Sequence, residues 1–418
     1  MKNNKNKISI IGAGISGIAT AVSLIKQGYS VDIFESKKNL GGRAGSFIKG
    51  ERLLDIGQHV FLPSYKNFIN LLSDLGCYED LKIVKKLRIP VIDNNQTFYI
   101  KSNFPFYPFN LIFSILNYKN VKFINRLRIL IGLLKLYLEK DSDLIFNKWL
   151  EKNSQNQETI KKFWEIICIS AVNAKLNDVK TSQVSKLFKI MIFDHKKGIG
   201  ISFFKKPFSE IIEKKFISYL KKHNSKLIIG ENIKNINKSK KGYIIESQYK
   251  KYNYEKIIIA TNLNSALKLG VVDRKKIIIS TNAIINIHLW FNKKVMNEKF
   301  IAFSNSKIEW IFSEDINKNR KEHKLIVSLS AVGDLIKKDN SYISSAYEKL
   351  VREALNIPRT TKTIDSLIIR SPKATQTTNS VIKNKKNLYF AGDWTISDLP
   401  NTMETAVLSS RKIVSKYF

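Results

Sequence analysis

Gln58 and His59 interrupt an otherwise apolar stretch near the start of the chain. Residues 54–61 read LDIGQHVF, so two polar side chains stand where an ordinary strand would continue with valine or isoleucine. Histidine exchanges a proton near neutral pH, and a neighbouring glutamine can orient the ring or bind a ligand. We therefore take His59 as a candidate proton donor and Gln58 as its partner. The alternative is that both are structural hydrogen-bonding residues.

Three glycines have the spacing of a dinucleotide site. Gly12, Gly14 and Gly17 form the pattern GAGISG after a short apolar segment and at the start of a helical one. The first glycine permits a tight turn, the second lets the backbone approach a pyrophosphate, and the third lets the helix pack closely. The pyrophosphate would lie on the free N–H groups of the helix N-terminus. Glu35, 18 residues after Gly17, can accept hydrogen bonds from ribose hydroxyls.

A second glycine turn follows in the stretch LGGRAGS, residues 40–46. Gly41 and Gly42 allow another backbone segment to approach the cofactor, and Arg43 can neutralise phosphate charge. A glycine turn with a surface arginine is the simpler alternative. Cys77 and Cys168 are the two cysteines, and because they lack metal-type spacing we expect no metal site and a reducing compartment.

The elements that must position these residues begin with a βαβ unit. We predict a strand over 7–11, a helix over 15–27 and a strand over 30–34. Residues 69–204 are predicted to be mainly helical, because Phe, Leu and Ile recur there at spacings of three and four. Further predicted helices cover 209–222, 342–355 and 403–417, and further strands cover 226–229, 243–246, 256–260, 284–291, 325–330 and 387–391.

The composition indicates the partners of the protein. The chain has 418 residues and a formal charge of +36, which comes mostly from scattered lysine. Arginine and aromatic residues do not form a stripe of the kind that binds nucleic acid. Dispersed basic charge instead favours attraction to an anionic membrane surface. The first 25 residues imitate a signal peptide, but the spaced glycines favour a buried strand, turn and helix. No segment reaches the roughly 20 uncharged apolar residues of a membrane span; the closest, residues 127–138, is broken by Arg128 and Lys135.

The GAGISG motif, Glu35 and the GGR turn resemble those of the flavin-containing amine oxidase and phytoene desaturase superfamily. Two further stretches share this resemblance: IIIATN at 257–262 and LYFAGDWT at 388–395. The resemblance implies FAD as the cofactor, with Asp393 on the ribityl chain. It also implies that the helix near Met403, capped by Asn401 or Thr402, points its N-terminus at the flavin. The other cofactor-binding positions that it implies are Ile15, Ser16, Ser36, Gly57, Gln58, His59, Ile233, Ala260, Thr261 and Gly392.

The implied fold class is α/β, with a discontinuous, Rossmann-like FAD-binding domain of the GR2 type and an α+β substrate domain of mixed sheet and helices. We expect residues 1–68, 205–268 and 385–418 to form the FAD-binding domain. Residues 69–204 and 269–384 are expected to form the substrate domain, with membrane-facing helices.

Four stretches are similar to one branch, the bacterial hydroxysqualene dehydroxylases of squalene and hopanoid biosynthesis. They are LDIGQHVF, FWEIICISAVN at 163–173, IHLWF at 287–291 and GDWTISDLPNTMETAV at 392–407. Thr405 and Ser410 stand where that branch commonly has glycine, and Pro63 and Ser64 precede Tyr65 where glycine is familiar. These departures bear on fine specificity more than on cofactor binding.

That branch removes the hydroxyl of a triterpene alcohol and supplies hydrogen, giving squalene. Such a site needs a proton donor, apolar walls and little water. The alternatives are a phytoene desaturase-like polyene desaturase, another flavin amine oxidase, or a binding protein without flavin use. His288 is expected to be a packed core residue; Trp164, Trp290 and Trp394 are candidate cavity walls or core.

An insoluble lipid substrate would have to be collected from a membrane. The segment FPFYPFNLIFSILNY, residues 104–118, is rich in Phe, Tyr and Leu and is flanked by Lys101, Lys119 and Lys122, as an interfacial anchor requires. A buried wall of the substrate domain is the alternative. We expect a cytoplasmic protein on the inner face of the cell membrane, and the sequence leaves its oligomeric state open.

Overall fold

The computed structural model describes residues 7–102, 104, 106, 108–140, 142–190, 200–314, 322–378 and 382–418. It separates two compact units, each discontinuous in sequence. Unit 1 comprises residues 1–83, 202–280 and 376–418, and unit 2 comprises 84–201 and 281–375. The first boundary lies after residue 83 and not after residue 68, because α2 (Lys66–Asp74) packs against α12 (Met403–Tyr417) within unit 1.

Unit 1 is built on a five-stranded parallel sheet in the order β10–β2–β1–β14–β20. These strands are β10 (Lys226–Ile229), β2 (Ser30–Glu35), β1 (Lys7–Ile11), β14 (Ile257–Ile259) and β20 (Leu388–Phe390). The apolar run III of β14, and the burial of four of the five residues of β1, suit a parallel sheet that is covered on both faces. The predicted Rossmann-like arrangement is confirmed.

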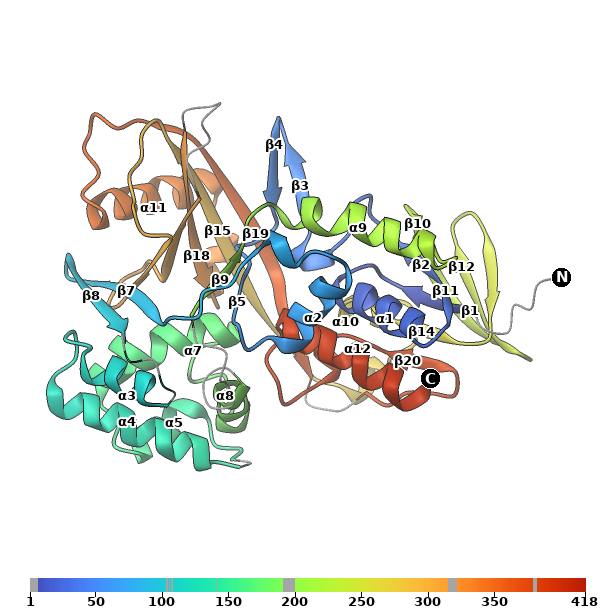
Figure 1. Ribbon diagram of the computed structural model, residues 1–418, viewed down its shortest axis with the longest axis horizontal. Coiled ribbons are helices and arrows are strands. Elements are labelled where there is room, and N and C mark those ends of the chain that lie inside the picture. Colours follow the sequence, from blue (N-terminus) through green and yellow to red (C-terminus); the bar gives the residue numbers. More distant parts are fainter. Residues whose placement is uncertain are drawn as a thin grey trace. The chain divides into compact units, whose positions relative to one another are not determined.

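The two faces of this sheet bury alternate residues. Ile258 lies in the core cluster formed with α1 (Ile15–Lys26), α9 (Phe208–Lys222) and α12. Ile257 and Ile259 lie in the second cluster, with residues of β11 (Ile233–Ser239), β12 (Gly242–Ser247) and the antiparallel sheet that these form with β13 (Lys251–Tyr254). Helices therefore cover one face and a small sheet the other, as the labelled elements of Figure 1 show.

Shorter strands complete unit 1. β3 (Ser46–Lys49) pairs with β4 (Arg52–Asp55). β9 (Ser202–Phe204) pairs with both β5 (Val60–Phe61) and β6 (Leu81–Lys82). The stretch LDIGQHVF thus contains the end of one strand, a turn over residues 56–59 and a second strand.

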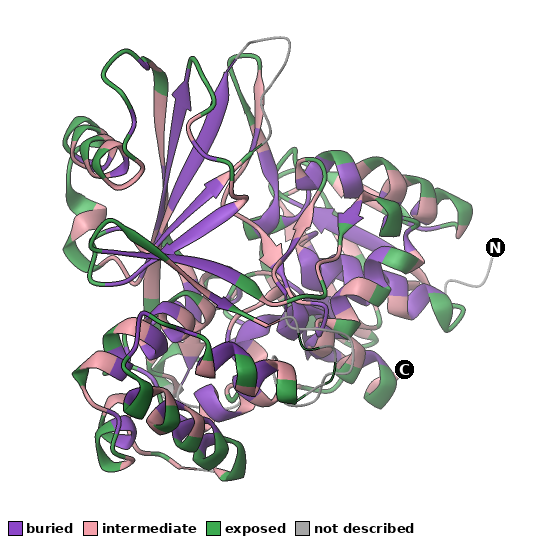
Figure 2. Ribbon diagram, turned by 60° about the vertical axis from the view of Figure 1, so that its left-hand side comes forward, coloured by how far each residue is buried: buried purple, intermediate pink, exposed green. Residues whose placement is uncertain are grey.

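Unit 2 contains a mixed sheet of seven strands in the order β19–β15–β18–β17–β16–β7–β8. The strands are β19 (Thr363–Thr378), β15 (Ile279–Phe291), β18 (His323–Ser330), β17 (Trp310–Ser313), β16 (Phe300–Phe303), β7 (Arg88–Asp93) and β8 (Gln96–Lys101). One face packs against α11 (Asn340–Ala354) through Ile343, Tyr347 and Val351. Figure 2 shows the inner strands of this sheet, such as β16 and β18, as largely buried, whereas the edge strands β19 and β8 are mostly intermediate or exposed.

The prediction that residues 69–204 are mainly helical is wrong for 88–101. These residues form the β7–β8 hairpin, which extends the seven-stranded sheet. Asn94 and Asn95 connect the strands with φ values of 48° and 62°, the conformation that a tight two-residue hairpin turn requires. An Asn-Asn pair between two alternating segments was therefore the signal that the helical interpretation missed.

The remaining helices of unit 2 are α3 (Phe109–Leu116), α4 (Phe123–Leu138), α5 (Phe146–Lys152), α6 (Gln157–Thr159), a π-helical turn at Ile160–Trp164, α7 (Glu165–Val172) and α8 (Thr181–Phe188). Trp164 is fully buried among them, between the rings of Phe146, Phe163 and Phe188, and its Nε1 donates to Gln155. It is a core residue. Within the described part of the chain, no helix has the length and apolar composition to cross a bilayer.

Candidate functional site

The turn between β1 and α1 needs glycine for steric reasons that the structure makes explicit. Gly12 has φ of +106°, and a Cβ there would lie 2.8 Å from the carbonyl oxygen of Ala260. A Cβ at Gly17 would lie 1.9 Å from the carbonyl oxygen of Gly12. Two of the three glycines are therefore required by the fold of the turn itself.

Gly14 differs, because the protein leaves room beside it. Its nearest neighbours, measured from an added Cβ, are the Gly42 Cα at 3.8 Å and the Gly41 oxygen at 4.0 Å. Gly14 is the N-cap of α1 and makes no side-chain capping hydrogen bond. The N-terminus of α1, where Ile15, Ser16 and Gly17 form the first turn, therefore offers backbone donors and space to an anionic group.

The second glycine turn lies directly against the first. Gly41 and Gly42 both have positive φ, and the Gly41 N–H donates to the Ala13 carbonyl at 2.9 Å. Gly14 and Gly41 form a parallel β-bridge. The two glycine motifs thus lie directly against each other, and the approach of both to a cofactor remains a prediction.

Arg43 connects this surface to the C-terminal motif. Its Nη2 lies 2.7 Å from Oδ1 and 2.6 Å from Oδ2 of Asp393, which is buried. Asp393 also accepts from the Trp394 N–H at 3.0 Å. Arg43 was expected to face phosphate and Asp393 the ribityl chain; both cofactor contacts stay predictions, and the structure adds an ion pair that joins the two residues.

Glu35 fastens the glycine turn to the end of β2. Its Oε2 accepts from the Ala13 N–H at 2.8 Å, and its Oε1 accepts from the Lys37 N–H at 2.9 Å and from the Ser36 hydroxyl at 3.3 Å. The N–H of Glu231, two residues before Ile233, donates to the Glu35 carbonyl at 3.1 Å. Ser36 and Ile233 therefore both lie near the carboxyl end of β2, and their contacts with a cofactor remain predictions.

The middle and C-terminal motifs border the same turn. The Ala260 N–H donates to the Ile11 carbonyl at 2.8 Å, and the Thr261 carbonyl accepts from Trp394 Nε1 at 2.9 Å. The Gly392 N–H donates to the Ser409 hydroxyl at 2.9 Å. Trp394 is consequently a buried residue that braces these two strand ends.

Thr402, and not Asn401, caps α12. The Thr402 hydroxyl accepts from the Thr405 N–H at 3.2 Å, one turn after the cap, and Met403 is the first residue of the helix. Thr405 and Ser410, which stand where the dehydroxylase branch commonly has glycine, both have hydrogen-bond partners for their hydroxyl groups. The Thr405 hydroxyl donates to the Pro400 carbonyl at 2.7 Å, and the Ser410 hydroxyl donates to the Ser16 carbonyl at 2.8 Å.

Gln58 and His59 lie in the turn between β4 and β5, with Gly57 before them. The His59 ring is 6.5 Å from the Phe208 ring, and its buried Nε2 has no hydrogen-bond partner among the described residues. Burial lowers the pKa of His59, although the nearby Asp55 carboxylate opposes the shift. The ring is therefore mainly uncharged at neutral pH and suits hydrogen bonding to a ligand better than delivery of a proton from imidazolium.

Asp55 holds this turn in place. Its Oδ1 accepts from the Ser46 hydroxyl at 2.5 Å and from the Phe208 N–H at 3.0 Å, at the start of α9. The Ile56 N–H donates to the Gly45 carbonyl at 2.9 Å. The turn that carries His59 is thus tied to the segment that follows the Gly41–Gly42 pair.

One residue that the sequence did not single out supports the site. Glu404, in the first turn of α12, is buried and accepts from the Asn67 N–H and side-chain amide and from the Phe68 N–H, at 3.1, 2.7 and 2.9 Å. It therefore satisfies the N-terminus of α2, whose N-cap Tyr65 makes no side-chain capping bond.

In unit 2, His288 is buried, as expected of a core histidine, but both ring nitrogens lack a hydrogen-bond partner in the described ranges. Burial lowers its pKa well below the usual value, and Lys324 acts in the same direction. Asn286 lies two residues earlier on the same face of β15, and its Oδ1 is also buried without a partner there.

Nowhere in the described ranges do three or more His, Cys, Asp or Glu side chains form a group that could hold a metal ion.

Comparison with known proteins identifies the family. The family described as flavin containing amine oxidoreductase matches residues 15–415. The chain belongs to this family. It is accordingly an FAD-dependent oxidoreductase, and the prediction of FAD as the cofactor is confirmed.

The residues of unit 1 fit this cofactor. The N-terminus of α1 has no side-chain cap, Gly14 leaves space beside the Gly42 backbone, and Asn401 Oδ1 is a buried polar atom without a partner in the described part of the chain. Such atoms are costly unless a ligand satisfies them. The positions at which each residue contacts FAD remain predictions.

Curated relatives are desaturases of carotenoid-type lipids at low identity. The chain is 22% identical to the 15-cis-phytoene desaturase of Arabidopsis thaliana over 457 residues, covering 98% of this chain and 80% of that one. It is 28% identical to the zeta-carotene desaturase of Solanum lycopersicum over 178 residues, covering 38% of this chain. The match spans only 30% of the tomato protein's own length.

Solved structures share the fold. An oxidoreductase from Methanosarcina mazei superposes with a TM-score of 0.72 at 17% identity, covering 98% of this chain and all of that one. A putrescine oxidase superposes with a TM-score of 0.74 at 13% identity, covering 98% of each chain. The predicted fold class is confirmed.

Proposed function

We propose that this enzyme exchanges hydrogen with a long, apolar isoprenoid lipid, and that desaturation of a polyene is its first candidate reaction. The observation that carries this proposal is the similarity to a phytoene desaturase along 98% of the chain. FAD, when bound, supplies the hydride chemistry. The chain's own residues would bind the cofactor, orient it and exclude water.

The proposed cofactor roles follow from the geometry of unit 1. The N-terminus of α1 would hold the pyrophosphate, and Glu35 the ribose, at the carboxyl ends of β1 and β2. Asp393, held by Arg43, would accept a hydrogen bond from a hydroxyl of the ribityl chain. The N-terminus of α12, at Thr402 and Met403, would stabilise negative charge that develops on the reduced ring.

A second candidate reaction is reductive dehydroxylation of hydroxysqualene to squalene in squalene or hopanoid biosynthesis. The Gln58–His59 pair favours this reaction. A substrate hydroxyl can hydrogen-bond the unsatisfied Nε2 of His59, whereas a hydrocarbon without polar groups cannot. With its lowered pKa, His59 would hydrogen-bond the substrate hydroxyl as a neutral ring, and Gln58 would orient the ring.

Either substrate would be practically insoluble in water. We propose that the protein is cytoplasmic and associates peripherally with the inner face of the cell membrane. Within residues 104–118, Phe104, Phe106, Phe109 and Phe113 are exposed, which supports contact with lipid, whereas Leu111 and Ile115 are buried. Pro105 and Tyr107 lie outside the described residues.

Anaerobic mixing in both redox directions tests the proposal. Desaturation predicts that a polyene such as phytoene bleaches the oxidised flavin absorbance and gives a product two hydrogens lighter. Dehydroxylation predicts that hydroxysqualene restores the oxidised spectrum of the reduced enzyme and yields squalene. If neither lipid changes the flavin spectrum or is converted, the proposed substrate class is wrong.

A further inference from the structure

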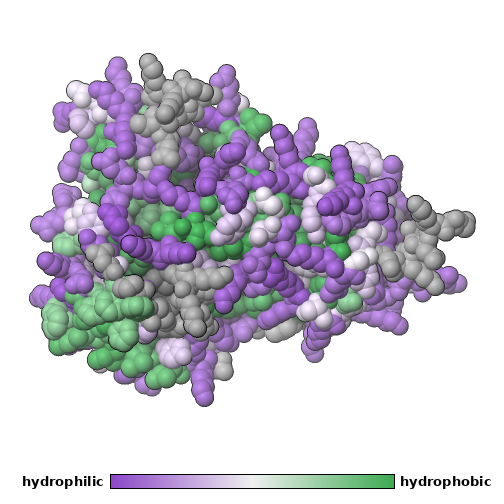
Figure 3. Space-filling model, in the orientation of Figure 1, coloured by the Kyte–Doolittle hydropathy of each residue, from purple (hydrophilic) through white to green (hydrophobic). Residues whose placement is uncertain are grey.

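An exposed apolar surface gathers on α3, on α4 and on the chain before α3. In Figure 3 it is the green area at the lower left, where Figure 1 draws these helices. We call it the α3–α4 surface. Its members are Phe104, Phe106, Phe109, Phe113, Phe123, Ile124, Leu127, Ile131, Leu134, Tyr137 and Leu138, which are eleven of the eighteen exposed large hydrophobic side chains in the described part of the chain.

The area of this surface exceeds what a soluble monomer usually leaves open. Each side chain is between 36% and 67% exposed. At roughly 200 Å² for a fully exposed large side chain, half exposure of these residues amounts to about 1,000 Å². The largest apolar patch on a typical monomer is roughly 300–600 Å² and is often functional.

α4 carries an apolar stripe that points away from the protein. Its exposed residues alternate spacings of three and four, which places them on one helix face: Ile124, Leu127, Ile131, Leu134 and Leu138. The buried residues are Asn125, Ile129, Gly132, Leu133 and Leu136. With about 100° of rotation per residue, the two faces are centred about 180° apart. α4 therefore has one apolar face for unit 2 and a second one for an external partner.

The charges around this stripe decide between the possible partners. Arg128 and Lys135 lie at one edge of the stripe. Arg126 lies about 80° beyond the other edge and donates to the Leu116 and Val121 carbonyls, and α4 contains no acidic residue. Residues 101–140 hold seven basic residues and one acidic residue, Glu139. A second copy of this helix would bring cations against cations. An anionic phospholipid surface supplies the opposite charge.

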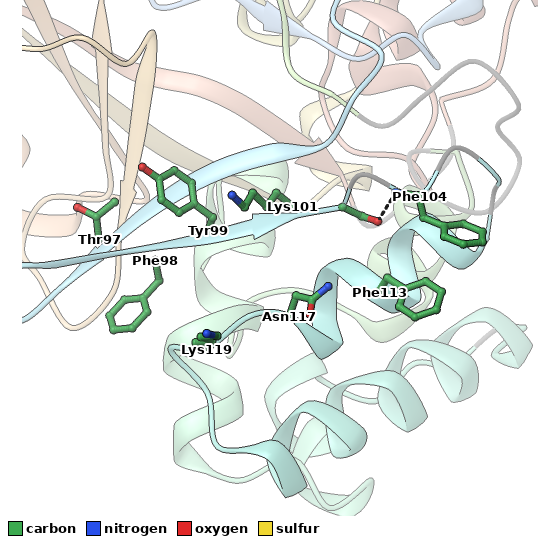
Figure 4. Close-up of a pocket in the computed structure, with 9 residues that line it drawn as sticks. Thr97, Phe98, Tyr99, Lys101, Phe104, Phe113, Asn117 and Lys119 are labelled. Carbon is green, nitrogen blue, oxygen red and sulfur yellow. Dashed lines mark hydrogen bonds between the residues drawn. The ribbon is translucent and has the colours of Figure 1, made fainter.

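A pocket beside the aromatic residues suits a lipid headgroup. The Phe104 ring lies 5.0 Å from the Phe113 ring and 6.0 Å from the Phe109 ring. The pocket, of about 520 Å³, is lined by residues of β8 and α3 and by Asn117 and Lys119, which follow α3. In Figure 4, Asn117 lies beside Phe113 and Lys101 lies at the end of β8 toward Phe104, whereas Lys119 lies on the side of Phe98. Ammonium and amide donors next to aromatic rings match a phosphate group next to acyl chains.

We propose that the α3–α4 surface docks on a bilayer that contains anionic phospholipid. α4 lies in the plane of the interface, with its stripe among the acyl chains and its basic residues at the headgroups. This deepens the proposed membrane association by naming its surface and its lipid class. It holds for either redox direction.

Co-sedimentation of the FAD-loaded protein with phosphatidylcholine vesicles, with and without phosphatidylglycerol, tests the proposal. We expect the wild type to bind the anionic vesicles more tightly and to lose this preference at high salt. The triple variant Ile131→Gln, Leu134→Gln, Leu138→Gln should bind roughly a hundredfold more weakly. A matched control exchanges three exposed isoleucines elsewhere, Ile48→Gln, Ile278→Gln and Ile364→Gln, and should bind like the wild type.

Further measurements keep the result interpretable. The double variant Arg128→Gln, Lys135→Gln should lose the preference for phosphatidylglycerol while its binding to phosphatidylcholine persists. Flavin absorbance and the unfolding midpoint identify misfolded variants; if the triple variant fails there, the single variant Ile131→Gln should still bind about fivefold more weakly. Reaction with detergent-solubilised lipid, measured in parallel, reports on the proposed chemistry and not on docking.

Wild-type vesicle binding by the triple variant would overturn the inference. If the mass of that variant by light scattering also fell from dimer to monomer, the stripe would pair with a second copy instead. A wild type that docks on vesicles but converts neither lipid in detergent would instead refute the proposed function alone.

Discussion

The substitution Gly14→Ala tests whether glycine is needed at this position for cofactor binding or for folding. Gly14 has φ of −73° and ψ of −178°, an extended conformation that alanine adopts freely. The added Cβ would meet only ordinary contacts, the nearest at 3.8 Å. Alanine lowers the conformational entropy of the unfolded chain, which stabilises the folded protein by about 0.4–1 kcal/mol. Alanine is also a poorer N-cap residue than glycine, and this offsets the gain. We expect the apoprotein's free energy of unfolding to stay within about 1 kcal/mol of wild type.

FAD binding should respond differently. If the pyrophosphate lies against Gly14, the methyl group intrudes on it, and overpacking of this kind costs roughly 1–3 kcal/mol. That corresponds to a dissociation constant raised roughly 5- to 150-fold. The assay is titration of apoprotein with FAD, followed by flavin fluorescence, beside urea unfolding of the same apoprotein.

Gly17→Ala is the matched comparison. Its Cβ would lie 1.9 Å from the Gly12 oxygen, so it should destabilise the apoprotein itself by about 3 kcal/mol or more. The reasoning is refuted if Gly14→Ala binds FAD like the wild type, or if it destabilises the apoprotein as much as Gly17→Ala does.

Three further predictions concern charged and titratable groups. Arg43→Met should lower the free energy of unfolding of the apoprotein by about 1–2 kcal/mol in urea, since it leaves buried Asp393 without its guanidinium while the 44% exposure of Arg43 limits the pair's strength. Arg43→Lys should recover most of this loss, because a single nitrogen, Arg43 Nη2, contacts both carboxylate oxygens and a lysine ammonium keeps the charge. The lowered pKa of His288 means that acid protonates the unfolded ring before the folded one, so stability should fall as pH drops below about 6.5, by up to about 1.4 kcal/mol per pH unit. His288→Gln should flatten this slope between pH 7.5 and 5.5, and an unchanged slope would contradict the assignment. Glu404→Ala should cost about 1–3 kcal/mol by leaving the α2 backbone donors unpaired, with Glu404→Gln costing less; equal values in urea unfolding would rule out this account.

The sequence predicted the part of the fold whose signals are local. The βαβ unit and the last helix have the predicted bounds to within a residue, because glycines punctuate the first and Thr402 begins the second. β11 and β13 escaped prediction, since their lysines and asparagines mask the alternation of strands. The β7–β8 hairpin was missed because apolar spacing alone does not distinguish short strands from helix turns.

The candidate site shows the same division. Each glycine turn could be predicted from its own residues. The ion pair between Arg43 and Asp393 could not, because it joins positions 350 residues apart and no neighbouring sequence around either residue indicates it. Likewise, Leu127–Leu138 was rejected as a membrane span because of Arg128 and Lys135. The stripe of α4 becomes visible only when burial shows which of its two apolar faces the protein covers.

The central claim is that the flavin of this enzyme exchanges hydride with an isoprenoid lipid. The most direct test is the anaerobic flavin spectrum of the purified holoenzyme, recorded with phytoene, with hydroxysqualene after prior reduction, and with putrescine and cyclohexylamine. The account predicts a change of flavin redox state with one of the two lipids, with the matching product by mass spectrometry, and none with either amine. Bleaching by an amine, with no response to either lipid, would contradict it.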